Sequence, residues 1–285
     1  MRDDGRRGRL AAGAWIGDGG PGGRSPSRPA VAYDRLCFRK RRMEELARHL
    51  TDWIAAEVTA AGGSGAVFGL SGGIDSAVVA ALAKRAFPHH TLGVLMPCHS
   101  DPQDAEDAVV VAHHFDIPHC TVDLGPVYDQ LLESLTTCSS DMHDSRLATA
   151  NLKPRLRMTT LYAFANQLGY RVLGTGNRSE LAVGYFTKYG DGGCDLLPLG
   201  SLVKGEVRDL AHYLGVPERV ITKPPSAGLW ADQTDETEMG LTYEELDAYL
   251  LTSEASPAVK AKVDAMNAAS AHKRALPRIA PKPGA

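Results

Sequence analysis

The pattern of apolar and polar positions predicts a helix that begins at Met43, followed by strands and helices in alternation. Apolar residues recur at helical spacing after Met43 and predict an amphipathic first helix: Leu46, Leu50, Trp53, Ile54 and Val58. The turn Gly62–Gly65 then leads into a short apolar run, Ala66–Leu70, which predicts a buried strand. The next stretch, Ala77–Ala86, has the length of a helix.

The same alternation continues along the chain. Three more strands are predicted at Thr91–Met96, Cys120–Leu124 and Tyr170–Leu173. Helices are predicted at Asp104–Phe115, Tyr128–Leu135, Arg146–Leu168, Lys204–Leu214, Tyr243–Leu250 and Pro257–Ala271. Pro154 lies inside the longest of them and predicts a break or kink there. Alternation of this kind favours an α/β fold with a parallel sheet and helices on both faces.

Composition divides the chain near residue 42. Residues 1–30 contain eight Gly and three Pro with almost no apolar periodicity, so we expect residues 1–42 to be a flexible basic tail. Eleven Lys and Arg stand against four Asp and Glu in residues 1–42, whereas the rest of the chain holds 20 basic and 30 acidic residues. An acidic folded part disfavours nucleic-acid binding. Met43 is an alternative start of the protein.

The cysteines and the hydropathy indicate a cytoplasmic protein without a membrane anchor. The chain has five cysteines, an odd number without a C-x-x-C pair, which disfavours a disulfide framework: Cys37, Cys98, Cys120, Cys138 and Cys194. No apolar run approaches the ~18–20 residues that a membrane-spanning helix requires. The short apolar stretch Leu10–Ile16 is interrupted by Gly13, so we expect no signal peptide.

The stretch AVFGLSGGIDSAVVAALAKRA carries the first chemical signal. Gly72 and Gly73 lie between the predicted strand and helix, where backbone N–H groups and the helix dipole attract an anion such as phosphate. Asp75 would repel phosphate unless a cation lay between them, which indicates Mg²⁺. The hydroxyls of Ser71 and Ser76 can donate to phosphate oxygens. An ordinary strand-to-helix turn capped by Ser71 is the alternative interpretation.

The pattern SGGxDS resembles the pyrophosphatase loop of the ATP-pyrophosphatase superfamily, enzymes that cleave ATP to AMP and pyrophosphate while adenylating a carboxylate or carbonyl oxygen. Two later segments resemble the signatures of the NAD synthetase family: GTGNRSELAVGYFTKYGDGGCDLLPLGSLVKGEVRDLA and KPPSAGLWADQTDETEMGLTYEELD. The segments NLKPRLRM and SAHKR are similar to further parts of that family. The resemblance implies one NAD synthetase domain over residues 43–280 with an adenine-nucleotide α-hydrolase-like α/β fold.

This family consists of cytoplasmic homodimers that use Mg²⁺. They convert deamido-NAD, ATP and ammonia to NAD, AMP and pyrophosphate through an NAD-adenylate. The resemblance implies an ATP site made of Gly69, Leu70, Ser71, Gly72, Gly73, Ile74, Asp75, Ser76, Thr175, Lys204 and Ser226. It implies contacts to deamido-NAD from Arg155, Lys188, Asp195, His272 and Lys273. Asp75 and Glu180 match the magnesium ligands.

The residue types agree with these roles. A phosphate loop without its own Lys needs a cation from elsewhere, and Lys204 at the start of a later helix can supply it. We therefore expect Asp75 and Lys204 to be catalytic. The basic residues assigned to deamido-NAD can offset the negative charge of its pyrophosphate and carboxylate.

Several alternatives stay open. Taken alone, a residue such as Glu180 is more often a helix-start carboxylate, and one such as Lys204 a solvated surface lysine. A tRNA-modifying ATP-pyrophosphatase is another enzyme class, but a basic face and paired cysteines would be expected there. A non-catalytic nucleotide-binding regulator is a third hypothesis, against which Asp75, Glu180 and Lys204 argue. A glutaminase domain would need roughly 200 further residues, so free ammonia or a separate glutaminase subunit is expected to supply the nitrogen.

Overall fold

The computed structural model describes residues 29–142, 144–226, 228, 230 and 234–282. The chain divides into two compact units, Met1–Arg39 and Lys40–Ala285. Helix α1 (Pro29–Ala60) begins earlier than predicted, so residues 29–42 are helical and the expectation of a flexible tail is wrong for them. The reason is local, because Pro29 suits the first position of a helix and no Gly or Pro follows it before residue 60. Residues 1–28 of the predicted tail lie outside the described residues.

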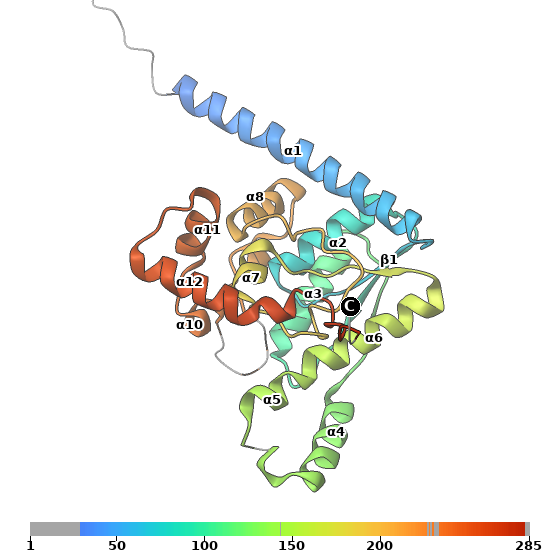
Figure 1. The fold of residues 1–285 in the computed structure, drawn as a ribbon. Coiled ribbons are helices and arrows are strands. Elements are labelled where there is room, and N and C mark those ends of the chain that lie inside the picture. The colour runs from blue at the N-terminus through green and yellow to red at the C-terminus, as the bar shows by residue number, and fades with distance from the viewer. Residues whose placement is uncertain (1–28, 143, 227, 229, 231–233, 283–285) are drawn as a thin grey trace, which may run out of the picture. The chain divides into compact units, whose positions relative to one another are not determined.

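The compact unit Lys40–Ala285 is built on a parallel sheet with the strand order β3-β2-β1-β4 (Figure 1). The strands are β1 (Ala66–Gly69), β2 (Thr91–Leu95), β3 (His119–Thr121) and β4 (Arg171–Val172). Ala66 of β1 pairs with Thr91 on one side and with Arg171 on the other. The four predicted strands are confirmed near their expected positions, and so is the parallel α/β class.

One predicted helix, α8 (Lys204–Leu214), has the expected bounds. The others are present with one or both ends shifted: α2 (Ile74–Ala86), α3 (Pro102–His114), α4 (Gly125–Cys138), α5 (Arg146–Ala150), α6 (Leu152–Leu168), α11 (Tyr243–Thr252) and α12 (Pro257–Ser270). The long helix is broken at Asn151, and Pro154 lies in the first turn of α6, where its missing N–H is not needed. Elements too short for a periodic signal were not predicted: η1 (Ser140–Met142), α7 (Arg178–Val183), α9 (Glu218–Ile221), α10 (Asp235–Met239) and η2 (Ala271–Lys273).

Alternate residues of β1 face two different cores. Phe68 packs with residues of α1, α2, α3 and α8 on one face of the sheet. Val67 packs on the other face with Val94, Val172 and Ala165 of α6. A third apolar cluster joins α7, α10, α11 and α12 around Leu246. Among the described residues no helix is long and apolar enough to cross a bilayer.

Candidate active site

The glycine-rich loop lies at the carboxyl end of β1. Gly69 ends the strand, and α2 begins at Ile74 with Gly73 as its N-cap. The chain continues from β1 to β2 and β3 on one side, whereas β4 pairs with the other side of β1. The loop therefore occupies the point where the strand order reverses, which is where open α/β sheets bind ligands. The first N–H groups of α2 point into this place and favour an anion.

The side chains of the loop mainly hold its shape. Leu70 and Ile74 belong to the hydrophobic core, and the N–H of Leu70 donates to the carbonyl oxygen of Val94 at 2.9 Å. Ser76 is buried and its hydroxyl donates to the carbonyl oxygen of Gly73 at 2.9 Å, while Ser71 Oγ lies 3.1 Å from Ser76 Oγ. Of the two serines expected to donate to phosphate, Ser71 is the exposed one.

Gly72 fixes the path of the loop against α3. Its φ is +76°, and a Cβ atom there would lie 2.3 Å from the carbonyl oxygen of Asp104 and 2.9 Å from Cβ of Asp107. A side chain is therefore excluded both by the left-handed backbone and by the close approach of α3. The loop rests directly on this helix.

The same helix holds the segment that follows α9. Lys223 Nζ lies 2.6 Å from Asp104 Oδ1 and 2.7 Å from Asp107 Oδ2, and Arg219 Nε donates to Asp107 Oδ1 at 2.7 Å. Burial alone would raise the pKa of Asp107, but the hydrogen bonds from Lys223 and Arg219 outweigh it and lower that pKa. These ion pairs connect α3, on which the glycine-rich loop rests, to Lys223 at the start of the KPPSAGLW stretch.

A capping box places Glu180 beside the loop. Asn177 caps α7: its Oδ1 accepts from the N–H of Glu180 at 3.0 Å, and Glu180 Oε2 accepts from the N–H of Asn177 at 3.0 Å. The side-chain amide nitrogen of Asn177, Nδ2, faces the loop and donates to Asp75 Oδ1 at 3.0 Å. Asn177 is completely buried, so this bridge between α7 and α2 is shielded from water.

Lys204, the first residue of α8, brings a positive charge to these two carboxylates. Its ammonium group contacts Asp75 Oδ2 and lies 3.4 Å from Glu180 Oε1, and the residue is 2% exposed. Burial on its own would lower the pKa of Lys204, but Asp75 and Glu180 raise it above its usual value. Burial raises the pKa of Glu180 to about 8 although Lys204 acts against it. The structure thus brings together Asp75, Glu180 and Lys204, as expected.

The two carboxylates also suit a hard divalent cation. Asp75 Oδ2 and Glu180 Oε1 converge on one point, where the ammonium group of Lys204 lies. In the described part of the chain, no group of three or more His, Cys, Asp or Glu residues is arranged to hold a metal. Mg²⁺ is commonly held by one or two carboxylates together with phosphates and water, so the donor set fits that ion without a larger protein cage.

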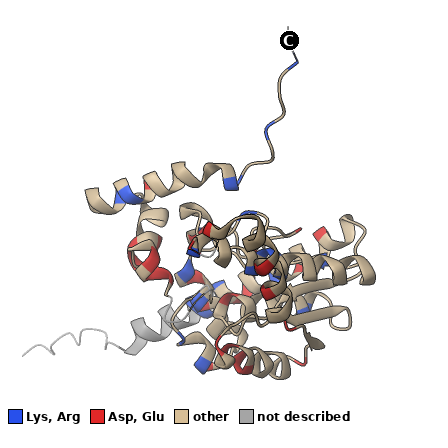
Figure 2. Ribbon diagram, turned by 90° about the horizontal axis from the view of Figure 1, so that it is seen from below, with Lys and Arg blue, Asp and Glu red and all other residues tan. Residues whose placement is uncertain are grey.

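The basic residues assigned to deamido-NAD come together at the end of α12. Lys188 Nζ donates to the carbonyl oxygen of His272 at 2.6 Å, and Arg155 Nη2 lies 3.5 Å from the carbonyl oxygen of Lys188. Lys273 Nζ donates at 2.7 Å to the carbonyl oxygens of Gly184 and Phe186. These lysines therefore hold the segment after α7 against η2. Figure 2 shows basic and acidic residues interspersed along the helices of the compact unit.

Within the described part of the chain, three predicted residues make no hydrogen bond or ion pair with the Asp75–Glu180–Lys204 cluster or with the basic residues near α12. Asp195 accepts from the N–H of Val172 at 2.8 Å and from the hydroxyl of Tyr162 at 3.0 Å, so it ties β4 to α6. Thr175 is half-buried just beyond β4, and Ser226 is exposed, with its Oγ accepting from the N–H of Gly228 at 3.1 Å. Their assigned roles stay predictions.

Three buried residues at the site were not predicted: Asn177, Asp235 and Tyr243. Asn177 could have been found, because N-x-x-E is the pattern of a capped helix. Tyr243 Oη donates to Asp235 Oδ2 at 2.9 Å, a long-range relation in space for which the sequence holds no local signal. A parallel sheet, a glycine-rich loop at its switch point and a carboxylate-bound lysine together define a nucleotide-binding α/β enzyme.

Comparison with known proteins specifies this class further. Residues 46–277 match the NAD synthase family model, and the chain belongs to that family. A relative from Carboxydothermus hydrogenoformans, an NH(3)-dependent NAD(+) synthetase, is 52% identical over 236 residues, which are 83% of this chain and 97% of the relative. The predicted family and its adenine-nucleotide α-hydrolase-like fold are confirmed.

Two solved structures are also similar. The NMN synthetase from Francisella tularensis has a TM-score of 0.79 at 38% identity, and the match covers 84% of this chain and 98% of that one. The NH3-dependent NAD synthetase from Campylobacter jejuni, in complex with the nitrate ion, has a TM-score of 0.68 at 31% identity, over 84% of this chain and 99% of that one.

The close contact at Gly72 predicts a measurable loss of stability. Gly72→Ala should combine the left-handed backbone penalty of about 1–2 kcal/mol with a steric penalty of about 1–3 kcal/mol against α3. Gly215, with φ +79° and nothing within 4 Å of a Cβ, is the matched control that reports the backbone penalty alone. The free energy of unfolding of the Gly72→Ala and Gly215→Ala variants is measured in urea. Equal losses in the two variants would contradict the close packing of the loop against α3.

The raised pKa of Glu180 predicts a pH-dependent stability. Its carboxyl binds a proton more tightly in the folded chain, with pKa about 8 against an ordinary 4.5, so its contribution to the free energy of unfolding falls as pH rises between these values. In EDTA, the drop in Tm between pH 5 and pH 8 should be smaller in Glu180→Gln than in the wild type. Glu244→Gln, at an exposed position of α11, should keep the wild-type drop. An unchanged drop in Glu180→Gln would contradict the assignment.

Proposed function

We propose that this chain is an ammonia-dependent NAD⁺ synthetase, a carbon–nitrogen ligase that amidates deamido-NAD with ATP and ammonia and releases AMP and pyrophosphate. One observation carries the proposal. Asp75 of the SGGIDS loop meets Glu180 and Lys204 at the point where the strand order of the sheet reverses, and we call this cluster the junction. Its relative from Carboxydothermus, of which it covers 97%, bears that name.

ATP binding starts from the backbone of the loop. The N–H groups of residues 72–74 and the dipole of α2 bind phosphate oxygens, since the loop contains no lysine of its own. Thr175 and Ser226 complete the ATP site in this proposal. Asp75 and Glu180 would hold Mg²⁺, which would neutralise part of the phosphate charge. Lys204 then turns its ammonium group from these carboxylates to the phosphates.

The reaction proceeds in two displacements. A carboxylate oxygen of the nicotinate forms a bond to the α-phosphorus of ATP, and the bond from that phosphorus to the β-phosphate oxygen breaks with its electron pair going to pyrophosphate. Lys204 stabilises this charge. Ammonia next attacks the acyl carbon, loses a proton, and AMP leaves. Positioning and charge compensation carry both steps, so no protein nucleophile is needed.

The basic group at the end of α12 binds the substrate. Arg155, Lys188, His272 and Lys273 lie within one set of contacts, and their charges suit the pyrophosphate and nicotinate carboxylate of deamido-NAD. Burial lowers the pKa of Lys273, so a nearby anion would stabilise the charged form of its ammonium group. Asp195 is assigned to a hydroxyl of the substrate.

A second candidate substrate is the mononucleotide. The same amidation applied to nicotinate mononucleotide yields NMN, the product named by the similar Francisella protein with its TM-score of 0.79. The test is a product assay of the full chain with ATP, Mg²⁺, ammonium and either acid substrate. NAD⁺ with AMP and pyrophosphate supports the first candidate, whereas amidation of the mononucleotide alone supports the second. ADP with phosphate would overturn both.

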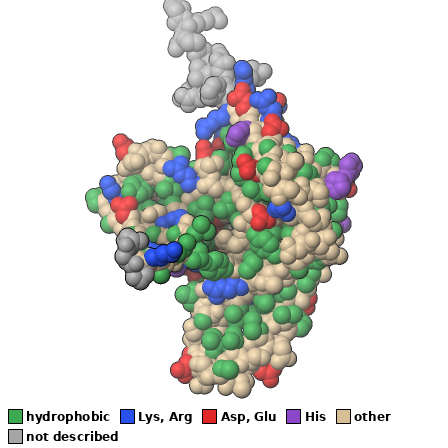
Figure 3. Space-filling model, turned by 45° about the vertical axis from the view of Figure 1, so that its right-hand side comes forward, with side chains coloured by type: hydrophobic (Ala, Val, Ile, Leu, Met, Phe, Trp, Pro, Cys, Tyr) green, Lys and Arg blue, Asp and Glu red, His purple; other side chains and the backbone are tan. Residues whose placement is uncertain are grey.

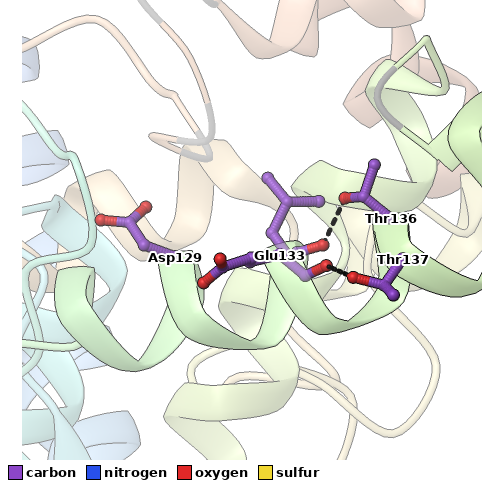
Figure 4. A pocket seen from close by; sticks show the side chains of 5 residues that line it. Asp129, Glu133, Thr136 and Thr137 are labelled. Carbon is purple, nitrogen blue, oxygen red and sulfur yellow. Dashed lines mark hydrogen bonds between the residues drawn. The ribbon is translucent and has the colours of Figure 1, made fainter.

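The proposed state is a cytoplasmic homodimer. Leu147 of α5 is 67% exposed and Val127 of α4 is 51% exposed, and hydrophobic side chains gather on this lower part of the molecule (Figure 3). Exposed apolar side chains that gather on one face mark interaction sites, and we assign this face to contact with a second copy of the chain. In the hollow on α4, the hydroxyls of Thr136 and Thr137 donate their hydrogens to backbone carbonyls of their own helix (Figure 4).

Replacement of Lys204 should slow adenylation far more than replacement of a lysine outside the site. With ammonia withheld, labelled pyrophosphate should exchange into ATP only in the presence of deamido-NAD and Mg²⁺. Lys204→Met should slow this exchange by about 10²–10³-fold, the usual effect of removing one charge-stabilising group. Lys84→Met removes a lysine that pairs with Asp116 on the surface, and should exchange normally. Exchange without deamido-NAD, or normal exchange in Lys204→Met, would contradict the mechanism.

Sedimentation at micromolar concentration should give the mass of two chains. Leu147→Glu should shift the equilibrium toward the monomer because it places a charge in the apolar contact. Leu251→Glu changes a leucine that is 56% exposed on α11 and serves as the control. A wild-type protein that sediments only as a monomer would refute the dimer.

A further inference from the structure

Lys204 rests against a side chain outside its carboxylate pair. The ammonium nitrogen lies 5.1 Å from the centre of the Tyr243 ring, within the range of a cation–π contact. Tyr243 is the first residue of α11 and is 4% exposed. Its hydroxyl donates to Asp235 Oδ2 at 2.9 Å and lies 3.5 Å from Glu180 Oε1. The ring therefore forms one wall of the lysine site.

Asp235 anchors this tyrosine and is itself fixed by its backbone. It is the first residue of α10, is 4% exposed, and its N–H donates to the carbonyl oxygen of Pro225 at 3.1 Å. The hydroxyl of Tyr185 and the ammonium group of Lys204 also act on this carboxylate, since both lower its pKa against the effect of burial. Asp235 therefore lies in the same polar cluster as Lys204 and the Tyr243 hydroxyl.

A second residue of α11 supports Lys204 one helical turn further on. Asp247 Oδ2 accepts from the N–H of Gly205 at 2.7 Å, and the hydroxyl of Ser179 donates to Asp247 Oδ1 while its oxygen accepts from the N–H of Lys204 at 3.1 Å. Residues four apart lie on one face of a helix, so Tyr243 and Asp247 both face the start of α8. α11 thus fixes the backbone of Lys204 through Asp247 and its ammonium group through Tyr243.

We propose that Tyr243 and Asp235 are positioning residues for the ligase reaction, with Asp235 orienting the Tyr243 hydroxyl and the Tyr243 ring orienting the Lys204 ammonium group. The inference rests on the proposed function. Through Tyr243, the backbone contact between Pro225 and Asp235 is connected to the Lys204 ammonium group, which stabilises the leaving pyrophosphate in the proposed reaction. Neither side chain needs to touch a substrate, and each acts through Lys204.

The test uses the full-length protein and compares kcat, KM for deamido-NAD and Tm. Tyr243→Phe keeps the ring but removes the hydroxyl, and Asp235→Ala removes its acceptor. Each should lower kcat about 10–100-fold, as is usual for groups that orient a functional residue, with KM for deamido-NAD unchanged. Asp235→Asn, which retains an acceptor oxygen, should recover most of the rate. Tyr249→Phe is the matched control, because its hydroxyl bonds Asp264 at 2.8 Å on an exposed part of α11.

A double variant separates positioning from general stability. If Asp235 acts through the Tyr243 hydroxyl, Tyr243→Phe with Asp235→Ala should be no slower than the slower single variant. Losses that multiply, or full kcat in Tyr243→Phe, would overturn the proposal. Should Asp235→Ala not fold, Tyr243→Phe decides alone, because a lowered kcat with an unchanged Tm supports the proposal and a full kcat overturns it. A wild-type protein that forms no NAD⁺ would instead overturn the proposed function, so the two failures are distinguishable.

Discussion

The ammonium group of Lys204, enclosed with the carboxylates of Asp75 and Glu180, is the interaction on which the site depends. A buried charge without a partner destabilises a fold by several kcal/mol. Lys204 comes from α8, and its partners come from α2 and α7, so charge compensation fixes three helices relative to one another. The same pairing keeps the ammonium group beside the glycine-rich loop, where the proposed function places the phosphates of ATP.

The rest of the compact unit keeps these groups in register. The strand order places the loop after β1 at the switch point of the sheet. Because Gly72 has no side chain, the backbone of α3 can pack directly against the loop. Asp107 of that helix then pairs with Arg219 and Lys223, which connects the loop to the segment leading to Asp235. Fold and site are therefore joined by short polar contacts between elements that are distant in sequence.

A continuous apolar run predicted the first strand because both of its faces are buried, with Phe68 in one core and Val67 in the other. Helical periodicity predicted the long helices. It did not predict α7 or α10, which are too short to complete a periodic pattern. The junction of Asp75, Glu180 and Lys204 followed only from family resemblance, since their spacing in the chain carries no information about distance. Tyr243 was not predicted, because its importance arises from the packing of α11 against α8.

The central claim is that this junction activates a carboxylate at the α-phosphorus of ATP, and isotope transfer tests it most directly. Deamido-NAD labelled with ¹⁸O in its nicotinate carboxylate should be converted with unlabelled ATP and ammonia. The account predicts that one labelled oxygen is found in the phosphate of AMP and the other in the amide of NAD⁺. Label in pyrophosphate or inorganic phosphate, or an unlabelled AMP, would contradict it.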